Sequence, residues 1–189
     1  MPVDTIERAI KRATGAGSEG SLEEIVYEGY GPGGAALLIE VLTDNRKRAV
    51  AEVRNAFTRA GGSLAEAGAV AWLFQQRGVL TIEVPNQDPD EIGLMAIDAG
   101  AEDVRVDDGT VEIYTAPTDL EAVRSSLDEA KVEVASAEVA MIPSTMLALD
   151  QQHTISTLRL MERLEDLDDV QKVYTNIEIS EEAVAAFAE

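Results

Sequence analysis

Basic side chains clustered in one short stretch give the sequence its clearest chemical signal. The cluster comprises Arg46, Lys47, Arg48, Arg54 and Arg59. These residues have helical spacings, and Glu52 is the single acidic residue among them. On a helix, Lys47 and Arg54 share one side, while Arg48 and Arg59 share an adjacent one. A solvated helix face usually alternates its charge signs, whereas this one is nearly one-signed within an acidic protein. We therefore expect it to contact phosphate groups, with a merely solvated face as the alternative.

A smaller group of cations lies near the start of the chain. Residues 4–13 have the pattern of a helix, and Lys11 and Arg12 on it can extend the basic patch, together with Arg8. A Gly/Ser-rich linker follows at 15–21.

A glycine-rich loop is the second candidate site, and it comprises Gly29, Tyr30, Gly31, Pro32, Gly33 and Gly34. Backbone amides in such a loop can bind an anion. However, no Gly-Lys-Ser/Thr follows, and the loop leads into a strand rather than a helix, so neither the P-loop nor the dinucleotide-binding pattern is met. A hairpin turn that needs positive φ is the favoured interpretation.

Catalytic and metal-binding patterns are not found. The chain has no Cys and one His, which excludes a thiolate site and any site with two imidazoles from one chain. Acidic clusters such as Asp107-Asp108 sit at turns or helix starts, where capping explains them. We expect a capping or surface role for His153 and a core position for Trp72. The sequence therefore predicts no enzyme, no metal and no cofactor.

Composition and charge limit the classes of protein to which the chain can belong. The chain has 189 residues, of which 46% are hydrophobic and 27% charged, and its net charge is −21. This composition is typical of a folded soluble protein, and without a signal peptide or a membrane-spanning run the expected location is the cytoplasm. The net charge is −1 over 1–77, −13 over 78–142 and −7 over 143–189. Such a dipolar molecule can still present a face that attracts phosphate.

The elements that position these residues follow from periodicity. Strands are expected at 23–30 and 35–42 as a hairpin, a helix at 45–60, and a further strand at 70–74. Near the other end, a helix is expected around 154–164 and a strand at 170–179.

The middle of the chain has its own pattern. Residues 78–142 follow the order β-α-β-β-α-β, the ferredoxin-like arrangement, with a hairpin at Asp108-Gly109. The flanking pieces are each too small to close a core, so 22–77 and 143–189 should form one discontinuous domain. The predicted fold class is α+β, with two α/β sandwich-like domains and the second inserted into the first.

Several motifs also carry a family resemblance across essentially the whole chain. They are Tyr27–Gly34 (YEGYGPGG), Asp44–Arg46 with Val50–Arg54, Ala99–Val104, and Ala137–Val139 with Ile142–Thr145. Together they closely resemble the YebC family, which includes bacterial YebC and PmpR proteins and the mitochondrial translational activator of cytochrome oxidase subunit I.

The resemblance implies a helical N-terminal domain followed by two α+β domains. The usual opening, with a Gly-His-Ser-Lys-Trp motif and a basic run, is absent, so we expect residues 1–21 to be a remnant of that domain and a linker.

Function is also implied by the resemblance. Members are generally described as transcriptional regulators that bind DNA, and some act in translation on the ribosome. The leading expectation is non-enzymatic regulation of gene expression through DNA. The alternatives are a ribosome-associated factor that binds rRNA or tRNA, and an acidic module that binds a protein partner. No membrane partner is expected.

Overall fold

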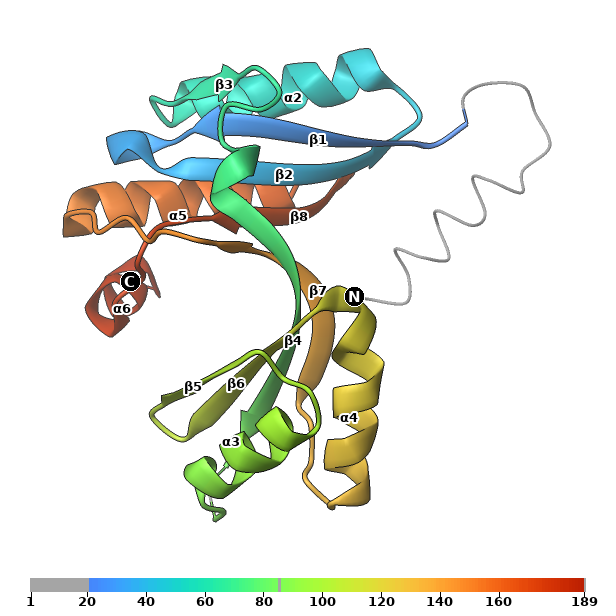
Figure 1. Ribbon diagram of the computed structural model, residues 1–189. Helices are drawn as coiled ribbons and strands as arrows, with labels where there is room; N and C mark the ends of the chain where they lie inside the picture. The colour runs from blue at the N-terminus through green and yellow to red at the C-terminus, as the bar shows by residue number, and fades with distance from the viewer. Residues whose placement is uncertain (1–20, 85, 189) are drawn as a thin grey trace. The chain divides into compact units, whose positions relative to one another are not determined.

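Two four-stranded antiparallel sheets, each with its own helices, make up the fold (Figure 1). The computed structural model describes residues 21–84 and 86–188. Contacts divide the chain into a first unit, Met1–Leu73 with Thr145–Glu189, and a second unit, Phe74–Ser144. The α+β class expected from the sequence is confirmed. The expected helix at 4–13, with Lys11 and Arg12, lies outside the described residues.

The first unit has the strand order β3-β1-β2-β8. Its strands are β1 (Glu23–Tyr30), β2 (Ala36–Thr43), β3 (Ser63–Ala65) and β8 (Val170–Thr175), and its helices are α2 (Arg46–Arg59), α5 (Gln151–Glu165) and α6 (Glu181–Ala188). The β1–β2 connection holds the short 3₁₀ helix η1 (Pro32–Gly34). β2 lies between β1 and β8, so the sheet joins residues from both ends of the described chain.

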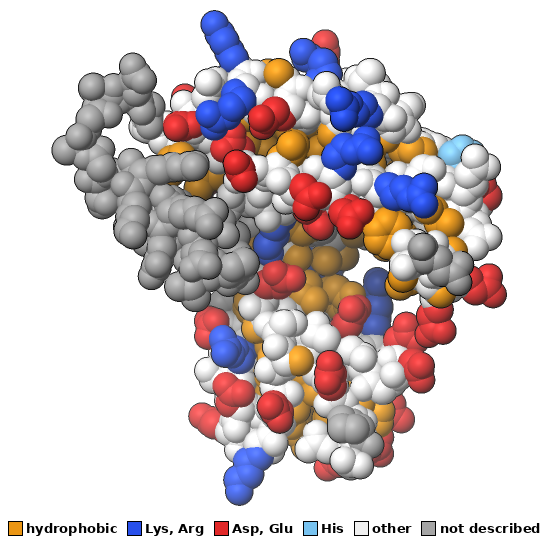
Figure 2. All heavy atoms as spheres, turned by 180° about the vertical axis from the view of Figure 1, so that it is seen from behind, with side chains coloured by type: hydrophobic (Ala, Val, Ile, Leu, Met, Phe, Trp, Pro, Cys, Tyr) orange, Lys and Arg blue, Asp and Glu red, His pale blue; other side chains and the backbone are white. Residues whose placement is uncertain are grey.

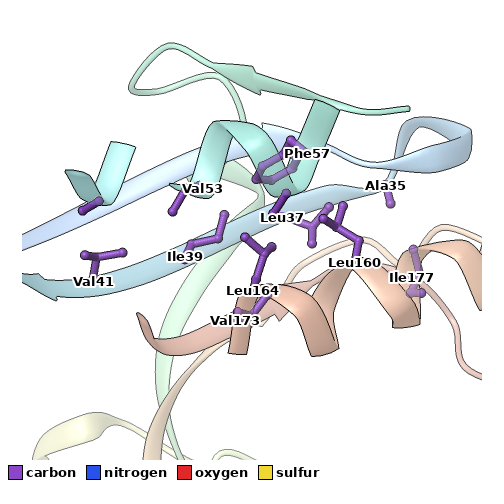
Figure 3. Close-up of a cluster of buried hydrophobic side chains, with 12 residues drawn as sticks. Ala35, Leu37, Ile39, Val41, Val53, Phe57, Leu160, Leu164, Val173 and Ile177 are labelled. Carbon is purple, nitrogen blue, oxygen red and sulfur yellow. The ribbon is translucent and has the colours of Figure 1, made fainter. Parts of the chain in front are cut away.

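The core of the first unit forms between this sheet and its two longer helices. Alternate β2 side chains face the helices, as the period of two requires: Leu37, Ile39 and Val41. α2 contributes Phe57 and α5 contributes Leu160, both fully buried (Figure 3). Because the two helices come from segments on either side of the second unit, neither segment alone supplies the whole core.

The second unit has the order β5-β6-β4-β7, which is the ferredoxin-like arrangement. Its elements are β4 (Phe74–Glu83), α3 (Pro89–Asp98), β5 (Asp103–Asp107), β6 (Thr110–Thr115), η3 (Pro117–Asp119), α4 (Leu120–Glu129) and β7 (Ser136–Pro143). Asp108 and Gly109 both have positive φ, at 34° and 84°, and form the expected two-residue hairpin turn. A separate core includes Leu80, Ile113 and Leu127.

Residues 70–74 are a correction to the sequence prediction. The segment forms the 3₁₀ turn η2 (Ala71–Leu73) instead of a strand, and β4 begins only at Phe74. Trp72, expected in the core, is 73% exposed. The reason is the buried carboxylate of Glu28, which accepts hydrogen bonds from the amides of Val70 and Ala71 and so replaces a strand neighbour.

Smaller differences concern element ends. β7 begins only at Ser136, because the Val132 amide donates to the Leu127 carbonyl at the end of α4. β8 ends at Thr175, and the short β3 and α6 were not expected. None of the described helices is long and apolar enough to cross a membrane.

Candidate nucleic-acid interface

Helix α2 is placed firmly at both of its ends and along its buried side. The Asn45 side chain caps it by accepting a hydrogen bond from the Arg48 amide at 3.0 Å, and Gly61 with φ 79° follows its C-terminus. Its buried side chains are Ala49, Val53, Ala56 and Phe57. The basic residues therefore occupy the remaining, outward side of a fixed helix.

Four of the five predicted cations on α2 are available to a ligand. Arg46, Lys47, Arg54 and Arg59 are exposed, and their side chains make no hydrogen bond or ion pair with other described residues. On the face seen in Figure 2, Lys and Arg side chains gather on the first unit, whereas Asp and Glu predominate on the second. An uncompensated group of cations on one helix favours phosphate contact.

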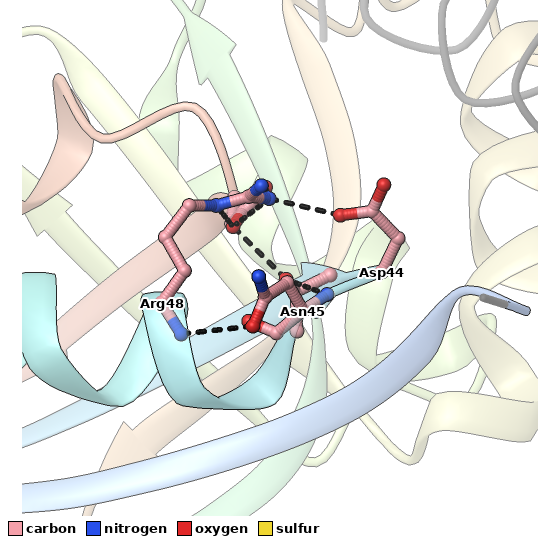
Figure 4. A network of polar contacts seen from close by, with 5 residues as sticks. Asp44, Asn45 and Arg48 are labelled. Atoms are coloured by element: carbon pink, nitrogen blue, oxygen red, sulfur yellow. Dashed lines mark hydrogen bonds and ion pairs between the residues drawn. The ribbon is translucent and has the colours of Figure 1, made fainter. Parts of the chain in front are cut away.

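Arg48, the fifth cation, is bound within the protein (Figure 4). Its guanidinium contacts both carboxylate oxygens of Asp169, at 2.9 Å and 3.2 Å, and also Asp44 at 2.9 Å. Asp169 is buried and accepts a further hydrogen bond from the Thr43 hydroxyl at 2.9 Å. Hydrogen bonds to Asp169 and then to Asp44 raise the pKa of Arg48. The structure thus separates Arg48 from the other four.

Acidic residues surround this network and mark one flank of α2. A hollow of about 430 Å³ is lined by Arg48, Glu52 and four carboxylates: Asp44, Asp166, Asp168 and Asp169. Negative charge there disfavours phosphate. A polyanion should therefore approach α2 from the side that carries Lys47 and Arg54.

The glycine-rich loop has the geometry of a turn. Gly33 and Gly34 have φ of 72° and 85°, in the left-handed region that glycine tolerates. The Gly31 amide donates to the Ala35 carbonyl at 2.8 Å, and the Gly34 amide donates to the Gly31 carbonyl. With these amides already paired, the loop offers no unbroken row of N–H groups to an anion.

The glycine-rich loop packs on the start of α5. A Cβ added at Gly33 would lie 2.8 Å from the Leu149 side chain and 3.1 Å from that of His153. His153 itself belongs to the helix cap, since its amide and ring nitrogen both contact the Asp150 carboxylate. Among the described residues, no group of three His, Cys, Asp or Glu side chains could hold a metal ion.

Glu28, Tyr30 and Trp72 form a second feature of the first unit, which the sequence patterns did not indicate as a group. Glu28 is 5% exposed, and its carboxylate accepts amide hydrogen bonds from Gly68, Val70 and Ala71. Burial by itself raises the pKa of Glu28, but these three hydrogen bonds outweigh it and lower the pKa. An acidic residue within a strand pattern is the only signal that could have pointed to this role.

The sequence of this chain is similar to those of known proteins. The sequence model described as "TACO1/YebC second and third domain" matches residues 22–177. A "probable transcriptional regulatory protein" of Chloroflexus aurantiacus is 53% identical over 189 residues, covering 99% of this chain and 75% of the relative. One from Herpetosiphon aurantiacus is 50% identical over 190 residues, covering 100% of this chain and 75% of the relative.

A solved structure resembles the fold over nearly the whole chain. It is the crystal structure of a conserved hypothetical protein from Aquifex aeolicus, with a TM-score of 0.80 and 38% sequence identity. The match covers 96% of this chain and 75% of that one.

Proposed function

The chain belongs to the TACO1/YebC family, and from that premise we propose that it regulates gene expression, without catalysing a reaction, by binding DNA through the exposed basic side of α2. The observation that carries the proposal is the set of four exposed cations on α2 that have no partner among the described residues: Arg46, Lys47, Arg54 and Arg59. The names of the relatives support a role in transcription.

The expected mode of binding is phosphate contact that does not depend on base sequence. Lys and Arg side chains on a helix neutralise backbone phosphates and release counterions, which makes affinity fall steeply with salt. Three or four such contacts predict a slope of log affinity against log salt of about −3 to −4. The net charge of −21 repels the same polyanion elsewhere, so phosphate contact should be confined to this one helix side.

A pair of charge reversals tests the proposal. Lys47→Glu with Arg54→Glu should weaken binding to a labelled DNA duplex and flatten its salt dependence by about two contacts. The matched control is Arg124→Glu with Lys131→Glu, which changes the net charge equally at exposed positions of the second unit. Fluorescence anisotropy over a salt series measures both quantities.

Equal weakening by the two double variants would show that only net charge matters and would overturn the assignment to α2. An RNA duplex of the same length distinguishes the ligand. Tighter binding to the RNA duplex than to the DNA duplex would replace DNA by RNA as the target.

A further inference from the structure

We propose that Tyr30 and Trp72 form a platform on which one unpaired nucleobase of a single-stranded nucleic acid stacks. The inference rests on the proposed function for the neighbouring phosphate contacts and adds a ligand class, single strands, to it. Trp72 is 73% exposed and Tyr30 is 41% exposed. Large exposed aromatic rings on a folded surface commonly mark a binding site.

The two rings are linked through one backbone atom. The Trp72 indole N–H donates to the Ala69 carbonyl at 3.0 Å, and the Tyr30 hydroxyl donates to the same carbonyl at 3.4 Å. With both polar groups used inside the protein, the rings offer their apolar faces to a partner. Nucleobases stack on such faces, and they do so with little dependence on base identity.

The loop that carries Trp72 is organised before any ligand binds. The Glu28 carboxylate accepts hydrogen bonds from three backbone amides of this loop, at 2.7 Å from Gly68, 2.7 Å from Val70 and 2.9 Å from Ala71. Val70 is fully buried, which anchors the loop on the sheet. Binding therefore needs little ordering of the protein, and this favours affinity from a small contact area.

The platform lies close to one end of the basic helix. Tyr30 pairs with Ser63 in the sheet, and Ser63 follows Arg59 by only four residues. The backbones of Arg59 and Ser63 are therefore at most about 14 Å apart. A single strand held by phosphate contact near Arg59 can place a neighbouring base on Tyr30 and Trp72.

The side of the sheet on which Tyr30 lies sets the path of the strand. A Cβ at Gly29 would meet the Phe57 ring of α2, so Gly29 faces the helices and Tyr30 faces the opposite side. A bound strand must therefore cross the sheet edge at β3, which is only three residues long. A flexible single strand can make this turn, whereas a stiff duplex cannot bend so sharply without a large energetic cost.

Trp72 reports on its own site, because it is the only tryptophan in the chain. The probes are a short oligothymidylate, an oligouridylate of the same length, and an abasic deoxyribose-phosphate strand of the same length. We expect both base-carrying strands to quench the Trp72 fluorescence, and the abasic strand to bind without quenching. Comparing the quenching by oligothymidylate with that by oligouridylate then distinguishes DNA from RNA as the source of the base.

Variants test the platform independently of fluorescence. By anisotropy with labelled strands, Trp72→Ala should weaken oligothymidylate binding by about 5- to 100-fold and leave abasic-strand binding unchanged. Trp72→Phe keeps a ring and should restore most of the affinity. Leu94→Ala removes another exposed apolar side chain, in the second unit, and should change neither affinity. Circular dichroism checks that each variant is folded.

The outcomes distinguish this inference from the function on which it rests. Equal binding of base-carrying and abasic strands, with unchanged Trp72 fluorescence, would overturn the platform and leave the role of α2 intact. Quenching by oligothymidylate without any binding of the abasic strand would support the platform and count against phosphate contact by α2. A wild-type protein that binds none of the strands would overturn the platform, and one that also fails to bind the DNA duplex would overturn the proposed function.

Discussion

Arg48 and Asp169 are joined through both carboxylate oxygens although 121 residues separate them in the sequence. The pair fixes the first turn of α2 to the segment between α5 and β8. Asp169 is nearly buried, with 4% of its side chain exposed, whereas Arg48 retains 44%. The pair therefore supports the first unit structurally and removes one cation from the basic side of α2.

Substitution of Arg48 should separate stability from nucleic-acid binding. Arg48→Gln leaves the buried Asp169 carboxylate without its main donor, so the melting temperature should fall by several degrees. DNA affinity should stay within about twofold of wild type. Arg54→Gln should show the reverse, with weaker binding and an unchanged melting temperature. If Arg48→Gln reduces affinity as much as Arg54→Gln does, Arg48 contacts the ligand after all.

Glu28 should make stability depend on acid pH. Its pKa is lowered from the ordinary value of 4.5, so the folded state favours the carboxylate. This contribution is complete above about pH 4.5 and is lost as pH falls through the lowered folded-state pKa. Urea unfolding at several pH values should show this decline in wild type and a weaker one in Glu28→Gln.

The same variant should also lose stability at neutral pH. A carboxamide offers one acceptor oxygen where the carboxylate uses two, so at least one loop amide loses its partner, at about 1–3 kcal/mol. The fluorescence emission of Trp72 should also change, because the loop that holds its ring beside Tyr30 loosens. Identical urea curves for the variant and wild type at neutral pH would contradict this role of Glu28.

Gly61 and Gly62 should tolerate alanine differently, although they are neighbours. Gly61 has φ 79° with open space around it, so alanine should cost about 1–2 kcal/mol of unfolding free energy. A Cβ at Gly62 would lie 2.3 Å from the Tyr30 carbonyl oxygen, which is backbone and cannot move aside. Gly62→Ala should therefore be the more destabilising change. Equal losses in urea unfolding would mean that β1 and this turn can separate freely.

The second unit should fold without the first. Its core residues all lie between Leu80 and Val139, and its four strands pair only with one another. A fragment of residues 74–144 should unfold cooperatively and give a dispersed amide NMR spectrum. A fragment of residues 21–73 should not, because α5 and β8 are missing from its core. A molten spectrum for 74–144 would show that the units depend on each other.

Much of this fold follows from local sequence patterns. α2 was expected at 45–60 and lies at Arg46–Arg59, because its apolar stripe and the Asn45 cap act within the helix itself. The hairpin at Asp108-Gly109 follows for the same reason. Segments whose conformation depends on distant partners were predicted less well. Residues 70–74 alternate like a strand, yet Glu28, more than forty positions away, determines their shape.

The candidate site shows the same division. The exposure of Lys47 and Arg54 follows from helical periodicity alone. The capture of Arg48 by Asp169 does not, because no local pattern brings the α5–β8 segment to the start of α2. Trp72 was expected in the core because alternation treats every aromatic residue in a strand pattern as buried.

The interrupted first unit also has a consequence for folding during synthesis. β1, β2 and α2 emerge well before α5 and β8, and Ile39 and Val53 then lack the side chains that cover them. At about 5–20 residues per second, translation of the 71 residues from 74 to 144 delays their partners by roughly 4–14 s. The second unit can fold once residue 144 has been made, before β8 is synthesised, since all its contacts are then available. The nascent chain therefore completes its middle first, and its N-terminal sheet stays open to chaperones until α5 and β8 close it.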